Sequence, residues 1–393
     1  MKKNVFFAVA FTFVAGAAFA QGNTSSVLQH GMNQSAMVSQ TGATNSSQVN
    51  QGGTVSPMSK NNLAEVDQSG SGNSSVIKQD NRNNQAFATQ IGEGNRSSQM
   101  QLNRSNDNIA TVYQHGDGNS ADQYQADNSS NNEATIEQGL NGASADNNRA
   151  IQYQRNFSGQ NYAYIQQTGD NNFAEQYQND VSALNEAYIY QSGDGNYADQ
   201  TQSLVSAGNY AVATQSGHDN SSVQRQEYVS ALNTASVVQS GDNNDAHQRQ
   251  IWVSAANTVV AVQSGDNNRS DQFQQDVSGL NYAGVMQSGN GNYASQQQVE
   301  LSGLLNQAII SQSGDNNTAY QDQSMGGANY AELNQSGSDN YSLQNQEGFY
   351  NWSVTNQSGG IGNSSTVYQS GSNQMSTVNQ HGSNNTAVVV QGN

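Results

Sequence analysis

The sequence contains no cysteine, a single proline and few large aliphatic side chains. Without cysteine, the disulfides that support many exported proteins are excluded. Leu, Ile, Val and Phe together make up about one residue in six, which is below the level expected of a chain that forms an ordinary apolar core. These shortages argue against a nucleotide-binding, barrel or helical enzyme domain.

Basic residues are also scarce, because 12 Lys and Arg stand against 30 Asp and Glu and give a net charge of −18. A protein that binds the phosphate backbone of nucleic acid needs a basic face, so we expect no nucleic-acid partner. Amide side chains are abundant instead, with Asn and Gln together making about 27% of the residues. Composition alone therefore indicates either a disordered, prion-like chain or a fold whose interior is not hydrocarbon.

The first twenty residues differ from the rest of the chain. Lys2 and Lys3 precede an apolar run from Val5 to Ala15, and Ala18-Phe19-Ala20 has the small-x-small pattern that signal peptidase cleaves. The apolar run is shorter than the ~20 residues that a membrane-spanning helix needs, which disfavours an N-terminal anchor. We predict a signal peptide at 1–20, a secreted mature chain, and one repeat domain at 21–393.

An internal repeat organises the mature chain. The motif Gln-x-Gly recurs every 24 residues through the middle of the sequence and then at intervals of 25, 23 and 22. Its glutamines there are Gln167, Gln191, Gln215, Gln239, Gln263, Gln287, Gln312, Gln335 and Gln357. Each unit divides into two similar arms, and near both ends the arms follow each other at only 11 residues. We count 31 arms, the first starting at Asn23 and the last at Asn385.

The two kinds of arm are typified by 185–191, Asn-Glu-Ala-Tyr-Ile-Tyr-Gln, and by 196–202, Asn-Tyr-Ala-Asp-Gln-Thr-Gln. In each arm the Asn, the Ala, the following Ile or Gln and the final Gln are spaced by two and share one face of a strand. A four-residue turn of the Ser-Gly-Asp-Asn type and a six-residue loop alternate between arms. A seven-residue strand cannot bury this face alone. We therefore predict an all-β solenoid, a cross-β stack of about 15 rungs with two arms per rung and two parallel sheets.

Stacking in register places identical amides above one another. A buried amide is costly when unpaired, but here each can donate to one neighbouring rung and accept from the other, as in cross-β fibrils. The predicted assembly ladder consists of Gln167, Gln178, Gln191, Gln202, Gln215, Gln239, Gln250, Gln263, Gln287, Gln312, Gln323, Asn172, Asn196, Asn244, Asn268, Asn292 and Asn317. The predicted fibre ends carry Gln29, Gln40, Gln369, Gln380 and Gln391. The terminal arms show no polar cap, so we expect their open edges to contact another copy.

The repeated pattern resembles the curlin repeat, the unit of the secreted bacterial functional amyloid called curli. Examples are QSGDGNYADQTQ from Gln191, QSGDNNDAHQRQ from Gln239 and QSGDNNTAYQDQ from Gln312. The resemblance covers nearly the whole mature chain. It implies passage through the periplasm and export through a dedicated outer-membrane pore, a curli-type nucleator as partner, and self-assembly into extracellular fibres. The chain departs from the family pattern in its greater length and in the missing targeting segment after the signal peptide.

The turn carboxylates are the candidate cation site. Asp170, Asp194, Asp242, Asp266 and Asp315 share one turn position, and stacking would place them about one rung apart. Two interpretations stay open. The column binds cations or acts as a pH-sensitive brake on assembly, or the residues serve ordinary turn chemistry, in which Asp is favoured by backbone hydrogen bonds.

No catalytic set is visible in the sequence. Three of the five histidines occupy the x of Gln-x-Gly, which is typical of solvated turn residues, and a narrow filled column offers no pocket. We expect no enzymatic activity and no cofactor. Aromatic residues recur just after the arm Asn, where they would point outward and either stack along the column or simply favour the strand. They are Tyr162, Phe173, Tyr197, Tyr210, Tyr282, Tyr293 and Tyr330.

These observations favour a structural subunit of extracellular, amyloid-like fibres in a biofilm matrix that supports adhesion. The alternatives are a monomeric secreted solenoid that acts as an adhesin or ligand-binding surface protein, and a disordered matrix polymer.

Overall fold

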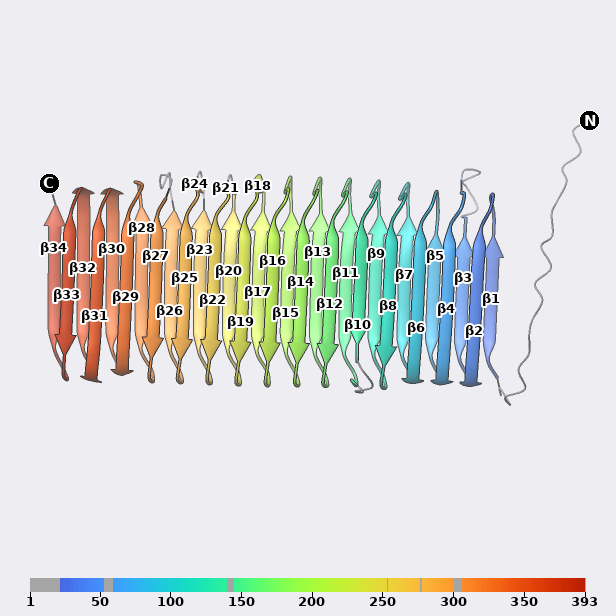
Figure 1. Cartoon of the computed structure of the whole chain (residues 1–393), viewed down its shortest axis with the longest axis horizontal. Coiled ribbons are helices and arrows are strands. Elements are labelled where there is room, and N and C mark those ends of the chain that lie inside the picture. The colour runs from blue at the N-terminus through green and yellow to red at the C-terminus, as the bar shows by residue number, and fades with distance from the viewer. Residues whose placement is uncertain are drawn as a thin grey trace, which may run out of the picture.

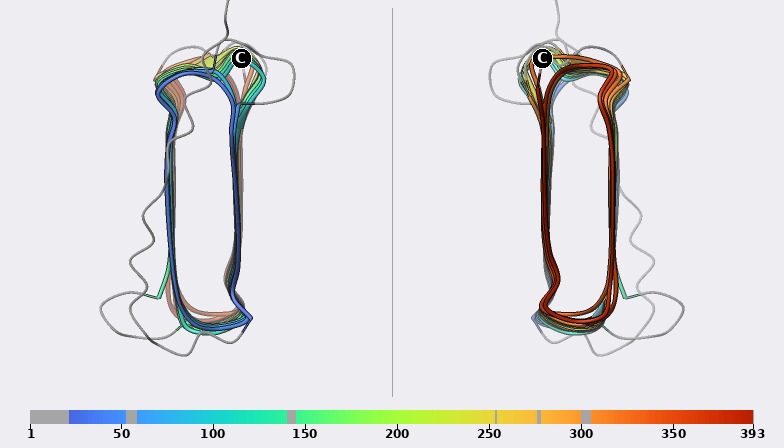
Figure 2. Two further views of the ribbon diagram at one scale, coloured as in Figure 1. Left: turned by 90° about the vertical axis from the view of Figure 1, so that its right-hand side faces the viewer. Right: turned by 90° about the vertical axis from the view of Figure 1, so that its left-hand side faces the viewer.

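The protein is a long, flat column of stacked β-strands (Figure 1). The computed structural model describes residues 22–52, 59–139, 145–252, 254–275, 278–299 and 305–392, and these residues contain no helix. Seen along its axis, the column has two long straight sides, which are sheets, and two narrow edges, which are turns (Figure 2). The predicted signal peptide at 1–20 lies outside the described residues.

One long side is a sheet of sixteen strands. In spatial order its strands are β1 (Thr24–Gln29), β3 (Ser46–Gln51), β5 (Ser74–Gln79), β7 (Arg96–Leu102), β9 (Ser120–Ala126), β11 (Arg149–Arg155), β13 (Phe173–Asn179), β15 (Tyr197–Ser203), β17 (Ser221–Glu227), β20 (Asp245–Ile251), β23 (Arg269–Gln275), β26 (Tyr293–Val299), β28 (Thr318–Ser324), β30 (Tyr341–Phe349), β32 (Ser364–Ser372) and β34 (Thr386–Gly392).

The other long side is a sheet of fifteen strands. They are β2 (Ser35–Ala43), β4 (Leu63–Ser71), β6 (Gln85–Glu93), β8 (Ile109–His115), β10 (Glu133–Gln138), β12 (Tyr162–Thr168), β14 (Glu186–Ser192), β16 (Tyr210–Ser216), β19 (Thr234–Ser240), β22 (Thr258–Ser264), β25 (Tyr282–Ser288), β27 (Gln307–Ser313), β29 (Tyr330–Ser338), β31 (Trp352–Ile361) and β33 (Met375–His381). A third, small sheet joins β18 (Ser230–Ala231), β21 (Ser254–Ala255) and β24 (Ser278–Gly279).

The predicted solenoid with two parallel sheets is confirmed, and the long strands of the two sheets correspond to the 31 arms. Strands pair in parallel, and equivalent arm positions lie next to each other. In the pairing of β12 with β14, Ala163 lies beside Ala187 and Gln167 beside Gln191. One irregularity occurs between β29 and β31, where the register shifts after Gln335. The small sheet of β18, β21 and β24 was not predicted, because its two-residue strands lie inside the six-residue loops.

The inward face of each arm carries the marked residues. In β14, Ala187, Ile189 and Gln191 are buried, whereas the residues between them are exposed or half-buried. Alanine lets the two sheets approach closely, and Ile189 packs in a thin apolar seam with Ile165 and alanines of the opposite sheet. Buried apolar residues therefore form several thin clusters along the column, and buried amides fill much of the remaining interior.

The four-residue turns form one edge of the column, and they require glycine. Gly193 has a φ of 94°, and a Cβ added there would lie 2.2 Å from the carbonyl oxygen of Gly217 in the next rung. Asn171 and Asn243 hold φ values of 58° and 57° in the same turns, a region that Asn tolerates better than most residues. The turns of neighbouring rungs are therefore in backbone contact and leave no room for a side chain at this glycine.

The six-residue loops form the other edge, the upper one in Figure 1, where the labels of β18, β21 and β24 stand. Val181 and Val205 there have φ values of 62° and 63° and are 56% and 55% exposed. Positive φ is unfavourable for a β-branched residue. Asn128, at the equivalent loop position of a rung nearer the N-terminus, has a φ of 66°. The loop edge is therefore polar in the first rungs and apolar in the middle ones.

Candidate assembly site: the amide ladders and the end faces

Two continuous glutamine ladders run through the whole described column. In each ladder Nε2 of one Gln donates to Oε1 of the Gln in the next rung toward the C-terminus, at 2.7–3.0 Å. The ladder of the fifteen-stranded sheet runs from Gln40 to Gln380 and contains the predicted Gln167, Gln191, Gln215, Gln239, Gln263, Gln287 and Gln312. The ladder of the sixteen-stranded sheet runs from Gln29 to Gln391 and contains the predicted Gln178, Gln202, Gln250, Gln323 and Gln369.

The second N–H of the ladder glutamines reaches a backbone carbonyl. Nε2 of Gln191 donates to the carbonyl oxygens of Phe173 in the opposite sheet and of Asn196 in the following turn, each at 3.0 Å. Gln202 likewise donates across the core to Glu186 at 3.1 Å. The side chains are almost completely buried, so these bonds remove the desolvation cost of the amide and also join the two sheets.

A third ladder was missed by our reasoning from the sequence. It lies at the centre of the sixteen-stranded sheet and runs from Gln99 to Gln344 through bonds of 2.7–3.0 Å. The signal was present as the first Gln of the arm Asn-x-Ala-x-Gln-x-Gln. At the C-terminal end, Nε2 of Gln344 instead meets the hydroxyls of Ser353 and Thr355, both at 3.0 Å.

This third ladder does not reach either end of the column. The central inward position of the end strands in the same sheet is aliphatic: Val27, Val49, Ile77, Val367 and Val389. The end arms of the two sheets are therefore alike, whereas the middle arms differ.

Asparagine columns line both edges. At the turn edge, the backbone N–H of each Asn donates to Oδ1 of the Asn one rung closer to the N-terminus, as in Asn196 to Asn172 at 3.0 Å. This column runs from Asn23 to Asn385 and contains the predicted Asn172, Asn196, Asn244, Asn268, Asn292 and Asn317. A matching column at the loop edge has Gln34 and Gln374 as its end members in place of Asn.

The two end faces are chemically different. At the N-terminal face, Gln29 and Gln40 donate to the rung behind them, so their Oε1 acceptors begin the ladders. At the C-terminal face, Gln380 and Gln391 accept from the previous rung and use one N–H on the carbonyls of Ser364 and Met375, both at 2.9 Å. The end strands are also open edges, because each of them pairs with only one neighbouring strand of its long sheet. One face therefore offers acceptors and the other offers donors.

The turn aspartates accept hydrogen bonds from the neighbouring rung. The backbone N–H of Asp170 donates to Oδ1 of Asp194 at 2.9 Å, and that of Asp242 to Oδ1 of Asp266 at 3.0 Å. The predicted run of acids is interrupted, because His218 lies between Asp194 and Asp242 in the stack. Asn290 likewise lies between Asp266 and Asp315 and uses the same acceptor geometry. In the part of the chain that the structure describes, no three metal-ligating side chains come together.

An ionic cluster lies on the outer face of the sixteen-stranded sheet. His247 lies 3.1 Å from Asp245 and 3.3 Å from Asp271, while Nε of Arg269 is 3.0 Å from Asp271. Hydrogen bonds to Asp245 and then to Asp271 raise the pKa of His247 to about 9, although its burial opposes the shift. Burial tends to raise the pKa of Asp271, but the hydrogen bonds from His247 and Arg269 outweigh burial and lower its pKa. Protonated His247 therefore links β20 to β23.

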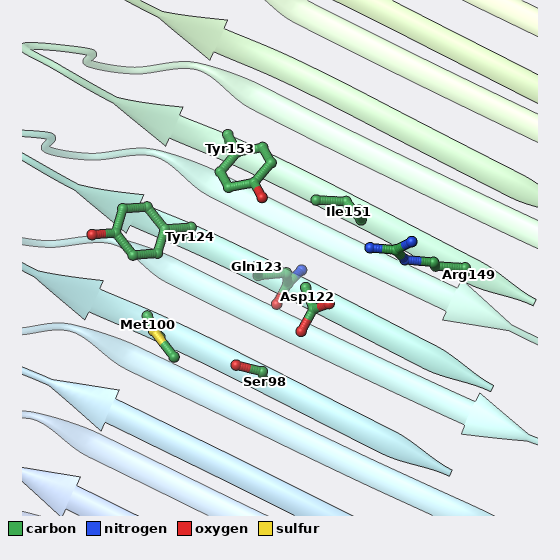
Figure 3. A pocket seen from close by; sticks show the side chains of 8 residues that line it. All are labelled: Ser98, Met100, Asp122, Gln123, Tyr124, Arg149, Ile151 and Tyr153. Atoms are coloured by element: carbon green, nitrogen blue, oxygen red, sulfur yellow. The ribbon is translucent and has the colours of Figure 1, made fainter. Parts of the chain in front are cut away.

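Aromatic side chains stack on the outer faces. Phe173 and Tyr197 are parallel at 5.5 Å, and Tyr153 and Tyr177 at 4.8 Å. A shallow depression of about 180 Å³ lies among two rows of side chains on β7, β9 and β11 (Figure 3). One row is Met100, Tyr124 and Tyr153, and the other is Ser98, Asp122 and Ile151, with Arg149 beside it. Pockets for small molecules usually measure about 300–1,000 Å³, so this depression is a surface feature and not an active-site cleft.

Comparison with protein families agrees with the repeat in the structure. Residues 60–92 match the model of the curlin associated repeat. The chain carries a curlin repeat. The matched segment contains β4, β5 and nearly all of β6. The two sheets to which these strands belong continue along the rest of the described column. Curlin repeats form a structural family. None of the curated proteins compared with the chain matches it.

The described residues also contain no helix with the length and apolarity needed to cross a bilayer.

Proposed function

We propose that the mature chain is a structural subunit of extracellular, amyloid-like fibres of the curli type, and that copies join end to end. The complementarity of the end faces carries this proposal. Gln380 and Gln391 end two ladders as donors, and Gln29 and Gln40 begin the same ladders as acceptors. A second copy placed on either face continues both ladders in the direction they already have.

The open backbone edges support the same conclusion. β1 and β34 end the sixteen-stranded sheet, and β2 and β33 end the fifteen-stranded one. Unprotected edges of this kind pair readily with another chain, and solenoids that remain monomeric carry polar caps on them. Here the end arms keep the strand spacing and the final ladder Gln of the interior arms, and their inward centre is apolar, with Val27 and Val389.

The fibre would form outside the cell as part of a biofilm matrix and support adhesion. The predicted signal peptide supports export to the periplasm, and the curlin repeat at 60–92 supports a dedicated outer-membrane pore and a nucleator of the curli type as partners. The chain itself is the main partner.

A monomeric adhesin is the second candidate, and the outward aromatic rows favour it. Stacked pairs such as Phe173 with Tyr197, and Tyr153 with Tyr177, give flat apolar surfaces at which a ligand or another surface could bind. This candidate does not explain the open, complementary end faces.

The decisive experiment follows purified residues 21–393 by size-exclusion chromatography, electron microscopy and fibre diffraction. We expect conversion to fibres with a spacing of 4.7–4.8 Å along the axis. The matched control is the double variant Val27→Lys and Val389→Lys, which places a charge at each end face and should stay monomeric. If the parent chain instead stays folded and monomeric for days at micromolar concentration, the adhesin replaces the fibre subunit.

A further inference from the structure

The arm count and the end arms specify how one copy sits on the next. We propose that successive copies in the fibre are related by a half-turn about the column axis, so that β33 contacts β1 of the next copy and β34 contacts its β2. This inference rests on the end-to-end assembly proposed above and specifies its interface.

The path of the chain favours the half-turn. The chain alternates between the two sheets, yet it begins with β1 and ends with β34, both in the sixteen-stranded sheet. A copy added without rotation sets its β1 on β34, but then one strand position, of about 4.8 Å, is empty between β33 and the next β2. A half-turn exchanges the two sheets of the added copy and fills both positions.

The half-turn also keeps the strands parallel. The chain runs along one long side and returns along the other (Figure 2), so strands of the two sheets point in opposite directions. Rotation by a half-turn about the column axis reverses each strand of the added copy. Strand β1 of that copy then has the direction of β33, and its β2 has the direction of β34, as parallel pairing requires.

The loss of the third ladder at both ends of the column also favours the half-turn. In the middle of the column, an arm of the sixteen-stranded sheet has a central Gln where an arm of the other sheet has an apolar residue, as at Gln200 and Ile189. Stacking these two kinds of arm would bury an unpaired amide, which costs about 1–3 kcal/mol. The end strands have Val27 and Val389 at this position, so arms of either sheet can stack there without that cost.

The inward side chains that would meet across the junction also match. The inward residues of β33 are Ser376, Val378 and Gln380, and they meet Ser25, Val27 and Gln29 of β1. The inward residues of β34 are Ala387, Val389 and Gln391, and they meet Ala36, Val38 and Gln40 of β2. Serine thus stacks on serine, alanine on alanine and valine on valine, and each Gln donor meets a Gln acceptor. Without rotation, Ala387 would lie on Ser25.

The chain ends fit the same arrangement. β34 ends at the upper edge in Figure 1, whereas β1 begins at the lower edge. A half-turn brings the start of the next copy to the edge where the previous copy ends, so the path of the solenoid continues. Near the ends of the chain, successive arms are 11 residues apart at both edges of the column, as from Gln29 to Gln40 to Gln51. The connections at the two edges therefore have the same length there, where the half-turn exchanges one edge for the other.

The test uses a single label on one edge. The chain has no cysteine, so Val229→Cys on the exposed loop edge gives a unique site for a gold cluster. We expect labels on fibres of this variant to alternate between opposite edges, with a repeat of about 74 Å per copy from 31 arms at about 2.4 Å each. Deleting 382–393 removes β34 and leaves 30 arms, so its labels should lie along one edge.

A second variant guards against failure of the truncated chain to assemble. Appending a copy of residues 381–391 after Gln391 gives 32 arms, and its labels should also follow one edge. Labels along one edge in fibres of the 31-arm chain would contradict the half-turn. They would indicate that the strand position between β33 and the next β2 is empty or is filled by another protein. Alternating labels in the chains with 30 and 32 arms would overturn it too. Complete absence of fibres from the parent would contradict the end-to-end assembly itself, a different result.

Discussion

Nε2 of Gln369 donates to Oε1 of Gln391 at 2.8 Å, and Gln391 is the last amide of its ladder within the chain. Gln391 in turn donates one N–H to the carbonyl of Met375 at 2.9 Å. Its other N–H is the donor that the next copy would use. The long buried ladder therefore ends at the molecular surface. We expect the loss of Gln391 to affect fibre growth more than folding of the chain.

Removing the ladder donors of the C-terminal face should slow fibre growth. In the double variant Gln380→Leu and Gln391→Leu, the incoming Gln29 and Gln40 acceptors are buried without partners, at a cost of about 1–3 kcal/mol each. We expect elongation from preformed seeds to fall by at least about tenfold, since about 1.4 kcal/mol corresponds to that factor. Gln48→Leu, which changes an exposed outward residue, is the control. Equal elongation rates would show that backbone pairing alone controls addition.

Breaking a ladder in the middle of the column should destabilise the fold. Gln298 accepts from Gln274 at 2.7 Å and donates to Gln323 at 2.8 Å. Gln298→Leu leaves both neighbours unmatched, so we expect a loss of about 2–5 kcal/mol in local stability. Hydrogen exchange of β23, β26 and β28 measures it. The adjacent Gln297→Leu faces solvent and should change little. Equal protection in both variants would contradict the ladder's structural role.

The turn glycines should be intolerant of alanine where rungs touch. Gly193 and Gly94 both have positive φ, but an added Cβ at Gly193 lies 2.2 Å from a carbonyl, whereas at Gly94 nothing lies within 4 Å. Gly94→Ala should cost about 1 kcal/mol through backbone conformation alone. Gly193→Ala should cost clearly more, because neighbouring turns must separate. Thermal unfolding compares the two, and similar losses would show that the turns can separate freely.

Stability should fall as the pH rises through the range in which His247 loses its proton. Its pKa is about 9 in the folded chain against about 6.5 when unfolded. The stabilisation is therefore fully present below about pH 6.5 and is lost by about pH 9. Because the side chain is 40% exposed, we expect only about 1 kcal/mol after solvent screening. His247→Gln should be less stable than the parent at pH 6 and equal to it above pH 9.5, by denaturant unfolding.

Neutralising the turn acids tests their role directly. Asn290 already replaces Asp in the stack and accepts the same backbone bond through Oδ1, so changing Asp170, Asp194, Asp242, Asp266 and Asp315 to Asn should preserve the fold. It removes five negative charges, and we expect faster assembly at low ionic strength, with the difference shrinking as salt screens the charges. Thioflavin fluorescence at several salt and calcium concentrations follows it. An unchanged response to calcium would leave the acids as turn residues only.

The fold was predictable because the pattern repeats. A spacing of two within an arm and of 24 between successive rungs predicted the strands, their inward face and the parallel stacking, and Gly193 and its equivalents marked the turns. The same arm motif occurs many times in the chain, so a single irregular arm such as β31 does not obscure the pattern. The ladders through Gln191 and Gln202 followed from burial of an amide that must find a partner.

Other features depend on contacts between rungs that no single arm encodes. The central ladder ends at Gln99 and Gln344 only because the flanking arms have Ile77 and Val367, which is visible once the strands are aligned. The pairing of Gln191 with the carbonyl of Phe173 needs the distance between sheets. The cluster of His247 with Asp271 joins residues 24 apart that carry no shared motif.

The two narrow edges of the column differ in their affinity for water. The turn edge carries Asp194, Asp242 and their equivalents, whereas Val181, Val205 and Leu232 stand exposed on the loop edge. The middle rungs therefore form a ribbon with acidic side chains on one edge and exposed apolar side chains on the other. At an air–water or plastic surface, single chains should lie with the loop edge of these rungs against the surface and lower the surface tension, even before they assemble.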